Sequence, residues 1–512
     1  MSARLSLRSR FPLLRRYAWF GLVLPCAYVG TAALGFVYRQ RCAGPALAAR
    51  HLPVAPAPRS ITRLMVFAPH CDDETLGCAG LIQQVIAAGG RAQAVILTNG
   101  DSFRTAVECQ AHTLRVTPRD YIDFAHLRQQ ESLQALANLG IGSQDVRFLG
   151  YPDQGLQALW NTNWTPDHLY QSPATRCDHA PYAAIFHNHA AYCGQSILDD
   201  IKANLRMFHP TLITVTHPAE DHGDHAFAAA FVTRALQELQ ADPDEASWAT
   251  QTRLEYYLIH RGDWPLPSAR PSGTAACPLV PPMEMMHTDT RWTGLPLSPL
   301  QTRRKAQSIR LYSSQTSMMS HFLNAFVRST ELYGDIGIGR LPRVPDYAIR
   351  VDGNTDDWQA LPPCLLDPVR DNVLRDLQGS GDIRALYACR DSRYLYLRLD
   401  CRQPVTDRMR YTVHLRPFAK GGATTTESIV VSLHTARPGT ITNEGIRLAS
   451  RDRSLEAAIP WKRLNTFELA SYGKSSSLLQ TETPMTSLAI SAETWAGVEV
   501  DKTGVRFLQV NE

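Results

Sequence analysis

A short apolar run that ends at a cluster of proton-binding side chains restricts the fold of this chain more than any other stretch. The run is Leu64 to Ala68, and the side chains that follow it within six residues are His70, Asp72, Asp73 and Glu74. Uninterrupted apolar runs of this length are typical of strands that are buried on both faces of a parallel sheet. The apolar spacing that follows predicts a helix over residues 76–88. A strand, a loop and a helix in this order put polar groups beyond the carboxyl end of the strand, where open α/β sheets bind their ligands.

The same alternation of apolar runs and amphipathic segments continues along the chain and predicts an α/β fold over residues 61–340. Further strands are expected at 92–98, 146–149 and 211–216, and helices at 127–139, 197–208 and over most of 301–333. Beyond about residue 341 the runs become short and alternating, with Gly, Pro, Asp and Asn between them, which predicts a β-sandwich over residues 346–512. A chain of 512 residues is long enough for two folded domains.

The first 38 residues carry a separate pattern. Residues 1–16 contain five arginines and no acidic side chain, and residues 17–38 are apolar and uncharged. About 20 apolar residues can span a bilayer, and the arginine excess keeps the segment before them cytoplasmic. We therefore predict a basic cytoplasmic segment at 1–16, a transmembrane signal anchor at 17–38, a linker at 39–60 and an extracytoplasmic remainder, periplasmic or lumenal. A cleaved signal peptide is the alternative for the apolar segment.

Composition argues against nucleic acid as a partner and against a structural zinc knuckle. The net charge is only +4, without a basic run, and the eleven cysteines show no C-x-x-C spacing. In an oxidising compartment Cys177 and Cys193 are the candidate disulfide, with free thiols as the alternative. Residues 156–194 are irregular and rich in rings, which either rim a sugar cleft by aromatic stacking or belong to an ordinary surface excursion. The rings are those of Trp160, Trp164, Tyr170, His168, His179, His187 and His189.

The first polar cluster has the residue types of a zinc site. His70 and Asp73 are three residues apart, so one tight turn can aim both at a single point. A neutral imidazole and a carboxylate suit zinc. Asp72, beside a ligating Asp73, points elsewhere and is free to act as a base. The alternative is a solvated acidic helix N-terminus, where Asp and Glu are favoured in any case.

A second polar cluster follows the strand expected at 211–216. It contains His222, Asp224 and His225. If both strands are central, both loops open on the same rim of the sheet, and His225 completes a His–Asp–His set with the first cluster. Three protein ligands leave one coordination position for water, as in catalytic zinc sites. His222 can then face the substrate, and Asp224 can orient one of the rings.

Several motifs resemble those of the zinc-dependent de-N-acetylases related to N-acetylglucosaminyl-phosphatidylinositol deacetylase and to the LmbE-like bacterial proteins. Pro69-His-Cys-Asp-Asp-Glu74 is similar to the family's P-H-x-D-D-E signature, and His222-Gly-Asp-His225 is similar to its H-P-D-H signature. Arg128-x-x-Glu131 resembles its R-x-x-E helix, and Gly150-Tyr-Pro-Asp153 its strand-end aspartate. Residues 305–315 and Glu331 resemble its last helices, so that the likeness covers about residues 61–340.

The resemblance implies a Rossmann-like, mostly parallel sheet with helices on both faces, and one zinc ion. The implied roles are metal ligands for His70, Asp73 and His225, general base for Asp72, oxyanion or leaving-amine partner for His222, and sugar contacts for Arg128 and Asp153. The sequence departs from the family pattern at Gly223 and Cys71, where prolines are common. Glu220 and Asp221 stand where some relatives have a tyrosine that assists the oxyanion, which leaves that helper unassigned.

The tail carries a second resemblance, to the family-9 carbohydrate-binding modules. The similar stretches are Val351 to Trp358, Asp382 to Tyr387 and Leu455 to Trp461. This resemblance implies a β-sandwich, and it leaves open whether the sandwich binds sugar or is purely structural.

Together these observations predict a membrane-anchored, zinc-dependent hydrolase that removes the N-acetyl group from an N-acetylated amino sugar in a glycan or glycolipid. The alternatives are an amidase that acts on a different N-acyl substrate and a non-catalytic surface protein that binds glycans.

Overall fold

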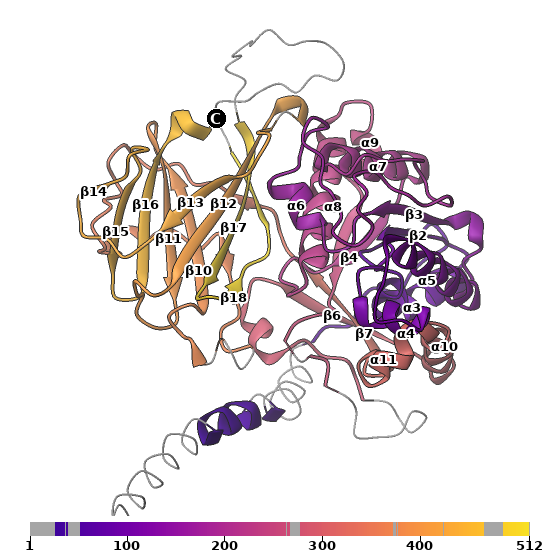
Figure 1. Cartoon of the computed structure of the whole chain (residues 1–512). Helices are drawn as coiled ribbons and strands as arrows, with labels where there is room; N and C mark the ends of the chain where they lie inside the picture. The colour runs from indigo at the N-terminus through magenta and orange to yellow at the C-terminus, as the bar shows by residue number, and fades with distance from the viewer. Residues whose placement is uncertain are drawn as a thin grey trace, which may run out of the picture.

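The computed structural model describes residues 26–35, 37–38, 52–262, 264–266, 277–371, 375, 377–422, 424–464 and 485–510. They form an α/β part, on the right in Figure 1, and a part made of antiparallel strands on the left. The predicted anchor at 17–38 lies largely outside these residues; its described portion is helical at 26–35. No helix within the described ranges is both long enough and apolar enough to cross a membrane.

The α/β part is built on a seven-stranded sheet with the order β3-β2-β1-β4-β5-β7-β6. Its strands are β1 (Arg63–Ala68), β2 (Arg91–Thr98), β3 (Val146–Tyr151), β4 (Leu212–Thr216), β5 (Arg253–Tyr257), β6 (Arg291–Pro296) and β7 (Thr330–Asp335). β1 to β5 are parallel, and β6 and β7 are antiparallel additions at one edge. The predicted mostly parallel sheet is therefore confirmed, and the order 3-2-1-4-5 is that of a Rossmann-type sheet.

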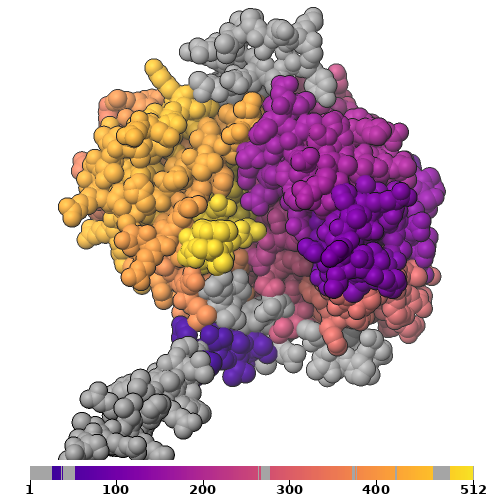
Figure 2. Space-filling model, in the orientation of Figure 1, coloured from indigo at the N-terminus to yellow at the C-terminus, as the bar shows by residue number. Residues whose placement is uncertain are grey.

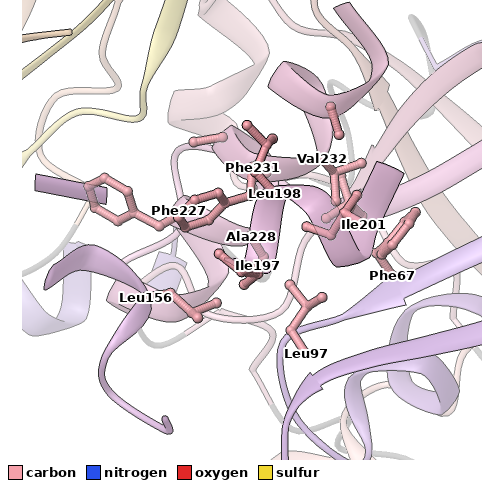
Figure 3. Close-up of a cluster of buried hydrophobic side chains, with 14 of the residues drawn as sticks. Phe67, Leu97, Leu156, Ile197, Leu198, Ile201, Phe227, Ala228, Phe231 and Val232 are labelled. Atoms are coloured by element: carbon pink, nitrogen blue, oxygen red, sulfur yellow. The ribbon is translucent and has the colours of Figure 1, made fainter. Parts of the chain in front are cut away.

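Helices cover both faces of this sheet. They are α3 (Asp73–Ala87), α4 (Arg104–Ala111), α5 (Pro118–Leu139), α6 (Leu156–Asn161), α7 (Gly194–Phe208), α8 (Gly223–Ala241), α9 (Ala246–Ala249), α10 (Pro299–Ile309) and α11 (Ser313–Asn324). Alternate residues of a strand point to opposite faces, so Met65 and Phe67 pack under α7 and α8, whereas Leu64 and Val66 pack under α3. Figure 3 shows the first of these clusters, with Phe67 at the right, next to Ile201 of α7.

The strand order reverses between β1 and β4. The chain runs outward from β1 through β2 to β3 and then returns to place β4 on the other side of β1. Leu64 pairs with Leu212 and Val66 with Thr214, so the two strands run in register and end together. Ligands bind in the crevice at such a switch point, and the loops that leave these two strands carry the two polar clusters.

One part of the expected helical segment at 301–333 is wrong. Glu331 does not lie on a helix but in β7, next to Lys305 of α10, whose Nζ is 2.8 Å from the Glu331 Oε1. Both side chains are fully buried, and Glu331 also accepts hydrogen bonds from the backbone of Gly80 and Leu81. Pairing of β7 with β5 and β6 overrides the local helical pattern.

The second part consists of two six-stranded sheets, called the sandwich here, that share one apolar core. One sheet contains β9 (Leu365–Leu366), β10 (Ile383–Arg390), β11 (Tyr394–Cys401), β14 (Thr440–Ile441), β15 (Arg447–Arg451) and β16 (Ser454–Pro460). The other contains β8 (Gly339–Arg340), β12 (Arg410–Ala419), β13 (Ile429–Leu433), β17 (Met485–Trp495), β18 (Glu499–Lys502) and β19 (Arg506–Gln509). All pairs are antiparallel except β8 with β19.

Short 3-10 helices occur in both parts of the protein. They lie at Ser143–Asp145, Met283–His287, Asp356–Trp358, Lys420–Gly422 and Trp461–Leu464.

Trp160 and Trp164 join the two parts of the protein instead of lining a cleft. Trp160 and Trp164 are each only 2% exposed, and Trp160 meets Phe418 and Phe507 of the sandwich edge-on or tilted at 6.0 Å. The Arg416 guanidinium lies 4.4 Å above the Trp164 ring. The interpretation of these tryptophans as the rim of a sugar cleft is wrong, because the sandwich covers them. The C-terminal strands lie at this seam (yellow in Figure 2).

The candidate disulfide is absent, and the alternative of free thiols holds. Cys177 and Cys193 are both free. The Cys193 Sγ lies 3.2 Å from the Ser196 Oγ, and the Cys177 Sγ faces the Thr175 carbonyl oxygen at 3.5 Å. Each sulfur therefore has its own local polar partner.

Candidate metal and catalytic site

The segments that follow β1 and β4 bring the three predicted metal ligands to one point: His70 precedes α3, Asp73 begins it, and His225 lies in the first turn of α8. The His70 Nδ1 lies 3.1 Å from the His225 Nε2, and the Asp73 Oδ2 is 3.3 Å from each of these nitrogens. Ligands that lie about 2.0–2.2 Å from a tetrahedral zinc ion are separated by roughly 3.3 Å. The three side chains are almost completely buried, with exposures of 8%, 1% and 0% for His70, Asp73 and His225. Their spacing and chemistry therefore fit a single divalent ion.

His70 presents its two ring nitrogens to different groups. Its Nε2 lies 3.2 Å from the Asp153 Oδ1 and 3.3 Å from the Asp224 Oδ2. A proton on Nε2 satisfies these carboxylates and leaves the Nδ1 lone pair free for an ion. Burial lowers the pKa of His70, but the hydrogen bonds with Asp153, Asp224 and Asp73 outweigh it and hold the pKa well above its ordinary value. Surroundings this negative also attract a divalent cation.

Two other groups of side chains lie close enough together to be considered as ligand sets. One combines His70, His222 and His225, and the other combines His70, Asp153 and Asp224. In the second group Asp224 already accepts hydrogen bonds from the backbone N–H groups of Gln154 and Leu156, at 2.6 and 2.9 Å. Asp224 is thus held beside the His70 ring, whereas the His70–Asp73–His225 set is the one whose three facing atoms lie within 3.3 Å of one another.

Asp153 is found behind His70, although the resemblance assigned it to the sugar. Besides the His70 contact, it accepts a hydrogen bond from the Ser102 N–H at 2.6 Å, and it also lines the cavity described below. Burial raises its pKa, but the hydrogen bond and charge of His70 outweigh burial and lower the pKa of Asp153 below its ordinary range. It is thus an ionised acceptor that can hold the ring of His70.

Glu220 is a residue whose role the sequence left open. Its carboxylate accepts hydrogen bonds from the backbone N–H of Ile259, at 2.5 Å, and of His260, and its Oε2 lies 3.7 Å from the His225 Nδ1. Burial raises the pKa of Glu220 well above its ordinary value. Glu220 therefore ties the end of β5 to the loop before α8 and stands behind His225, on the side away from Asp73.

Asp72 occupies a strained position at the mouth of the site. Its φ of 146° is unusual for a residue with a side chain. The Arg128 Nη2 lies 3.2 Å from the Asp72 Oδ2, and Arg128 also donates to the carbonyl oxygens of Gly100 and Cys71 at 2.5 and 2.6 Å. Burial raises the pKa of Asp72 to about 8, although the charge of Arg128 opposes the shift. Arg128 thus contacts Asp72 directly and borders the cavity beside it.

His222 lies next to the predicted ligands and faces open space. Its ring is 4.8 Å from the His70 ring, edge to face, and 5.1 Å from the His225 ring. It is partly exposed and lines the cavity. Burial and the neighbouring charge of His70 lower its pKa, which favours the neutral imidazole.

A cavity of about 270 Å³ opens over these side chains. Of the polar residues described above, His70, Asp72, Asp73, Arg128, Asp153 and His222 line it, and its apolar wall consists of Leu76, Phe103, Met319, Phe322 and Leu323. The wall also holds His260, a residue that the sequence reasoning missed. The His260 ring stacks on Phe322 at 5.0 Å and meets the His225 ring at 4.9 Å. The sequence signal that could have identified His260 is its position just past the carboxyl end of β5, which pairs in parallel with β4.

Comparison with known proteins gives the following similarities. No curated protein matches the chain at a significant level. A conserved protein from Thermus thermophilus has 20% identity and a TM-score of 0.32 over 54% of this chain and 94% of its own. The N,N'-diacetylchitobiose deacetylase from Pyrococcus horikoshii has 16% identity and a TM-score of 0.32 over 53% of this chain and 82% of its own. A deacetylase of the teicoplanin biosynthesis pathway has 16% identity and a TM-score of 0.34 over 53% and 97%. Residues 65–236, which contain both loops of the site, match the model of the GlcNAc-PI de-N-acetylase (PIG-L) family.

Proposed function

We propose that this protein is a metal-dependent amide hydrolase that removes the N-acetyl group from an N-acetylated amino sugar in a glycan or glycolipid. The observation that carries the proposal is the convergence of the His70 Nδ1, the Asp73 Oδ2 and the His225 Nε2 within 3.3 Å, with Asp72 beside them at the cavity. The family match over residues 65–236 supports the same reaction class.

Five polar residues of the site have a task in the proposed reaction. His70, Asp73 and His225 would hold one divalent ion, for which we propose zinc; when bound, it activates water and polarises the amide carbonyl. Asp72 accepts a proton from the attacking water. We assign His222 to donate a hydrogen bond to the developing oxyanion or to protonate the leaving amine. The amide C–N bond breaks, and acetate and a free amino sugar leave the site.

The location of the enzyme and the organisation of the chain are part of the proposal. We propose that residues 17–38 anchor the chain in a membrane with the catalytic part, 61–340, on the extracytoplasmic side. The region 346–512 would then face the same compartment as the substrate glycan, which its resemblance to carbohydrate-binding modules also favours. A substrate that is itself polymeric or membrane-bound suits this arrangement.

A second candidate is an amide hydrolase for a larger N-acyl group. The apolar wall of the cavity, formed by Phe103, Met319 and Phe322 among others, favours it. Such a wall could contact a hydrocarbon acyl chain as well as the apolar face of a sugar ring. The two candidates share the same metal site and the same catalytic residues and differ only in the acyl group.

The test is acid release by the purified full-length chain after chelation and after addition of zinc. N-acetylglucosamine oligomers should yield acetate only in the zinc-loaded protein, and oligomers with a longer N-acyl chain separate the two candidates. Zinc-loaded protein that releases no acid from either class, and yet binds glycans, would favour the non-catalytic surface protein.

A further inference from the structure

The loop that carries His222 is held by the sandwich as well as by its own sheet. Residues 217–222 connect β4 to α8, and Asp221 is the immediate neighbour of His222. The Asp221 Oδ1 lies 2.8 Å from the Nη2 of Arg375, which precedes β10 of the sandwich. The two side chains are 154 residues apart in the chain. The loop of the catalytic site therefore ends in an ion pair with the other part of the protein.

Arg375 joins three carboxylates with its three nitrogens. Besides Asp221, the Nη1 lies 2.8 Å from the Asp371 Oδ2 and the Nε lies 2.6 Å from the Asp501 Oδ1. Its side chain is 3% exposed, and those of Asp371 and Asp501 are 1% and 0% exposed. A planar guanidinium can make these contacts at once, whereas a lysine ammonium is a single point charge. Arg375 thereby fixes Asp221 relative to β18.

Arg261, which follows β5 of the α/β part, contacts the Asp221 carboxylate as well. Its Nη1 donates to the Ala219 carbonyl oxygen at 2.8 Å and lies 3.3 Å from the Asp221 Oδ1, and its Nη2 pairs with Asp371. The Gly262 N–H donates to the Asp221 Oδ2 at 2.5 Å. Asp221 therefore forms ion pairs with Arg261 of the α/β part and with Arg375 of the sandwich, and both arginines also contact Asp371.

A backbone contact supports the loop at a second point. A Cβ atom on Gly504 would lie only 2.5 Å from the backbone C and O of Pro218. Gly504 lies between β18 and β19, so the sandwich touches the loop at both of its halves, at Pro218 and at Asp221. His225, in contrast, lies on α8, and its carbonyl oxygen accepts a hydrogen bond from the Thr216 Oγ1 at 2.8 Å.

We propose that Arg375 is a positioning residue, through which the sandwich sets the place of His222 at the cavity. The sandwich is then a part of the catalytic unit and not only a sugar-facing attachment. Because His70 and Asp73 follow β1, at the start of α3, and His225 is anchored in α8, loss of the Arg375 contact should displace His222 and leave the metal in place. The catalytic consequence depends on the proposed hydrolase function, but the positioning itself does not.

The experiment compares full-length wild type with Arg375→Ala, Arg375→Lys and Asp221→Asn. The matched control is Arg398→Ala, which removes another sandwich ion pair, from Arg398 to Asp400, that does not touch the loop. The first readout is hydrogen–deuterium exchange of residues 217–222. We expect it to rise about tenfold or more in Arg375→Ala and Asp221→Asn, less in Arg375→Lys, and not in Arg398→Ala.

The second readout is kinetic. We expect kcat for acetate release to fall about tenfold or more in Arg375→Ala, with KM and metal content close to wild type, because misplacement of a catalytic group mainly affects the reacting complex. The Asp221→Asn/Arg375→Ala double variant should lose no more than either single variant. Unchanged loop exchange in a folded Arg375→Ala protein, or equal effects in Arg398→Ala, overturns the proposal. If wild type itself releases no acid, the proposed function fails, and the exchange data still decide the positioning.

Discussion

The His70 Nδ1 and the His225 Nε2 face each other at 3.1 Å, although 155 residues separate them in the chain. Both rings are buried, and the Asp73 Oδ2 lies 3.3 Å from each nitrogen. Two imidazole nitrogens and a carboxylate oxygen at this spacing compete for one positive charge. One divalent ion, the metal of the proposed function, would satisfy all three at once.

Removal of a ligand should remove the metal. His225→Ala leaves two protein ligands, and we expect its zinc affinity to fall by more than the roughly 10- to 100-fold that loss of an outer-shell partner typically costs. The measurement is zinc content after dialysis, together with titration calorimetry. His222→Ala is the control, since it should keep its zinc; equal zinc content in both variants would contradict the assignment of His225.

Asp72 should matter for rate and not for metal. Asp72→Asn keeps the shape of the side chain and its contact with Arg128 but removes the basic oxygen. We expect kcat to fall by about 100- to 10,000-fold, the usual contribution of general acid–base groups. Zinc content should stay at the wild-type level. A metal-replete Asp72→Asn protein with full activity would exclude Asp72 as the base.

The ion network around Arg375 should make stability depend on pH. Burial raises the pKa of Asp367 from 3.8 to about 8, against the opposing charge of Arg261. Between these two pH values the folded protein holds a proton that the unfolded chain releases, so this contribution to stability is complete below about pH 4 and is lost as the pH rises toward 8. Asp367→Asn imitates the neutral acid and should flatten this decline.

The check is the melting temperature of wild type and Asp367→Asn from pH 5 to pH 8. The exposed Asp123, whose side chain is 65% exposed, supplies the control variant Asp123→Asn, which should follow the wild-type curve. Parallel curves for all three proteins would show that Asp367 is ionised in the folded state at neutral pH.

The seam between the two parts should contribute strongly to stability. Trp164 is 2% exposed and packs against Phe418 and under Arg416. Trp164→Ala should lower the free energy of unfolding by about 3–5 kcal/mol, as for other large buried aromatic side chains. Trp495→Ala, at a position that is 42% exposed, should change it by less than about 0.5 kcal/mol. Denaturant unfolding measures both, and a small effect at Trp164 would mean that the two parts are only loosely joined.

The parts of the site that were predictable from the sequence are those that depend on neighbours in the chain. His70, Asp72 and Asp73 follow one strand directly, and His222 and His225 follow another, so residue type and spacing were enough to propose a shared metal. The contacts of Arg128 and Asp153 were not predictable in this way. Each depends on where its side chain ends relative to a loop more than 25 residues away, and both turn toward His70 and Asp72.

Other features depend on pairings between distant segments and carry no local signal. Glu331 lies in a stretch with a helical pattern but belongs to a strand. β7 pairs with β5 and β6, and Lys305 neutralises the buried Glu331 carboxylate. The sequence pattern favoured a surface position for Trp160 and Trp164, but the sandwich covers both side chains in the folded protein.

The sequence by itself determined the strand–loop–helix units, the two polar clusters at strand ends and the change to short alternating strands after about residue 341, because periodicity and loop chemistry act over a few residues. Only the tertiary structure decided which strands lie side by side, that β1 and β4 meet at the reversal of strand order, and that Arg375 reaches Asp221. Those contacts are set by the burial of whole sheets and helices against one another, a property of the complete fold that no single stretch of residues encodes.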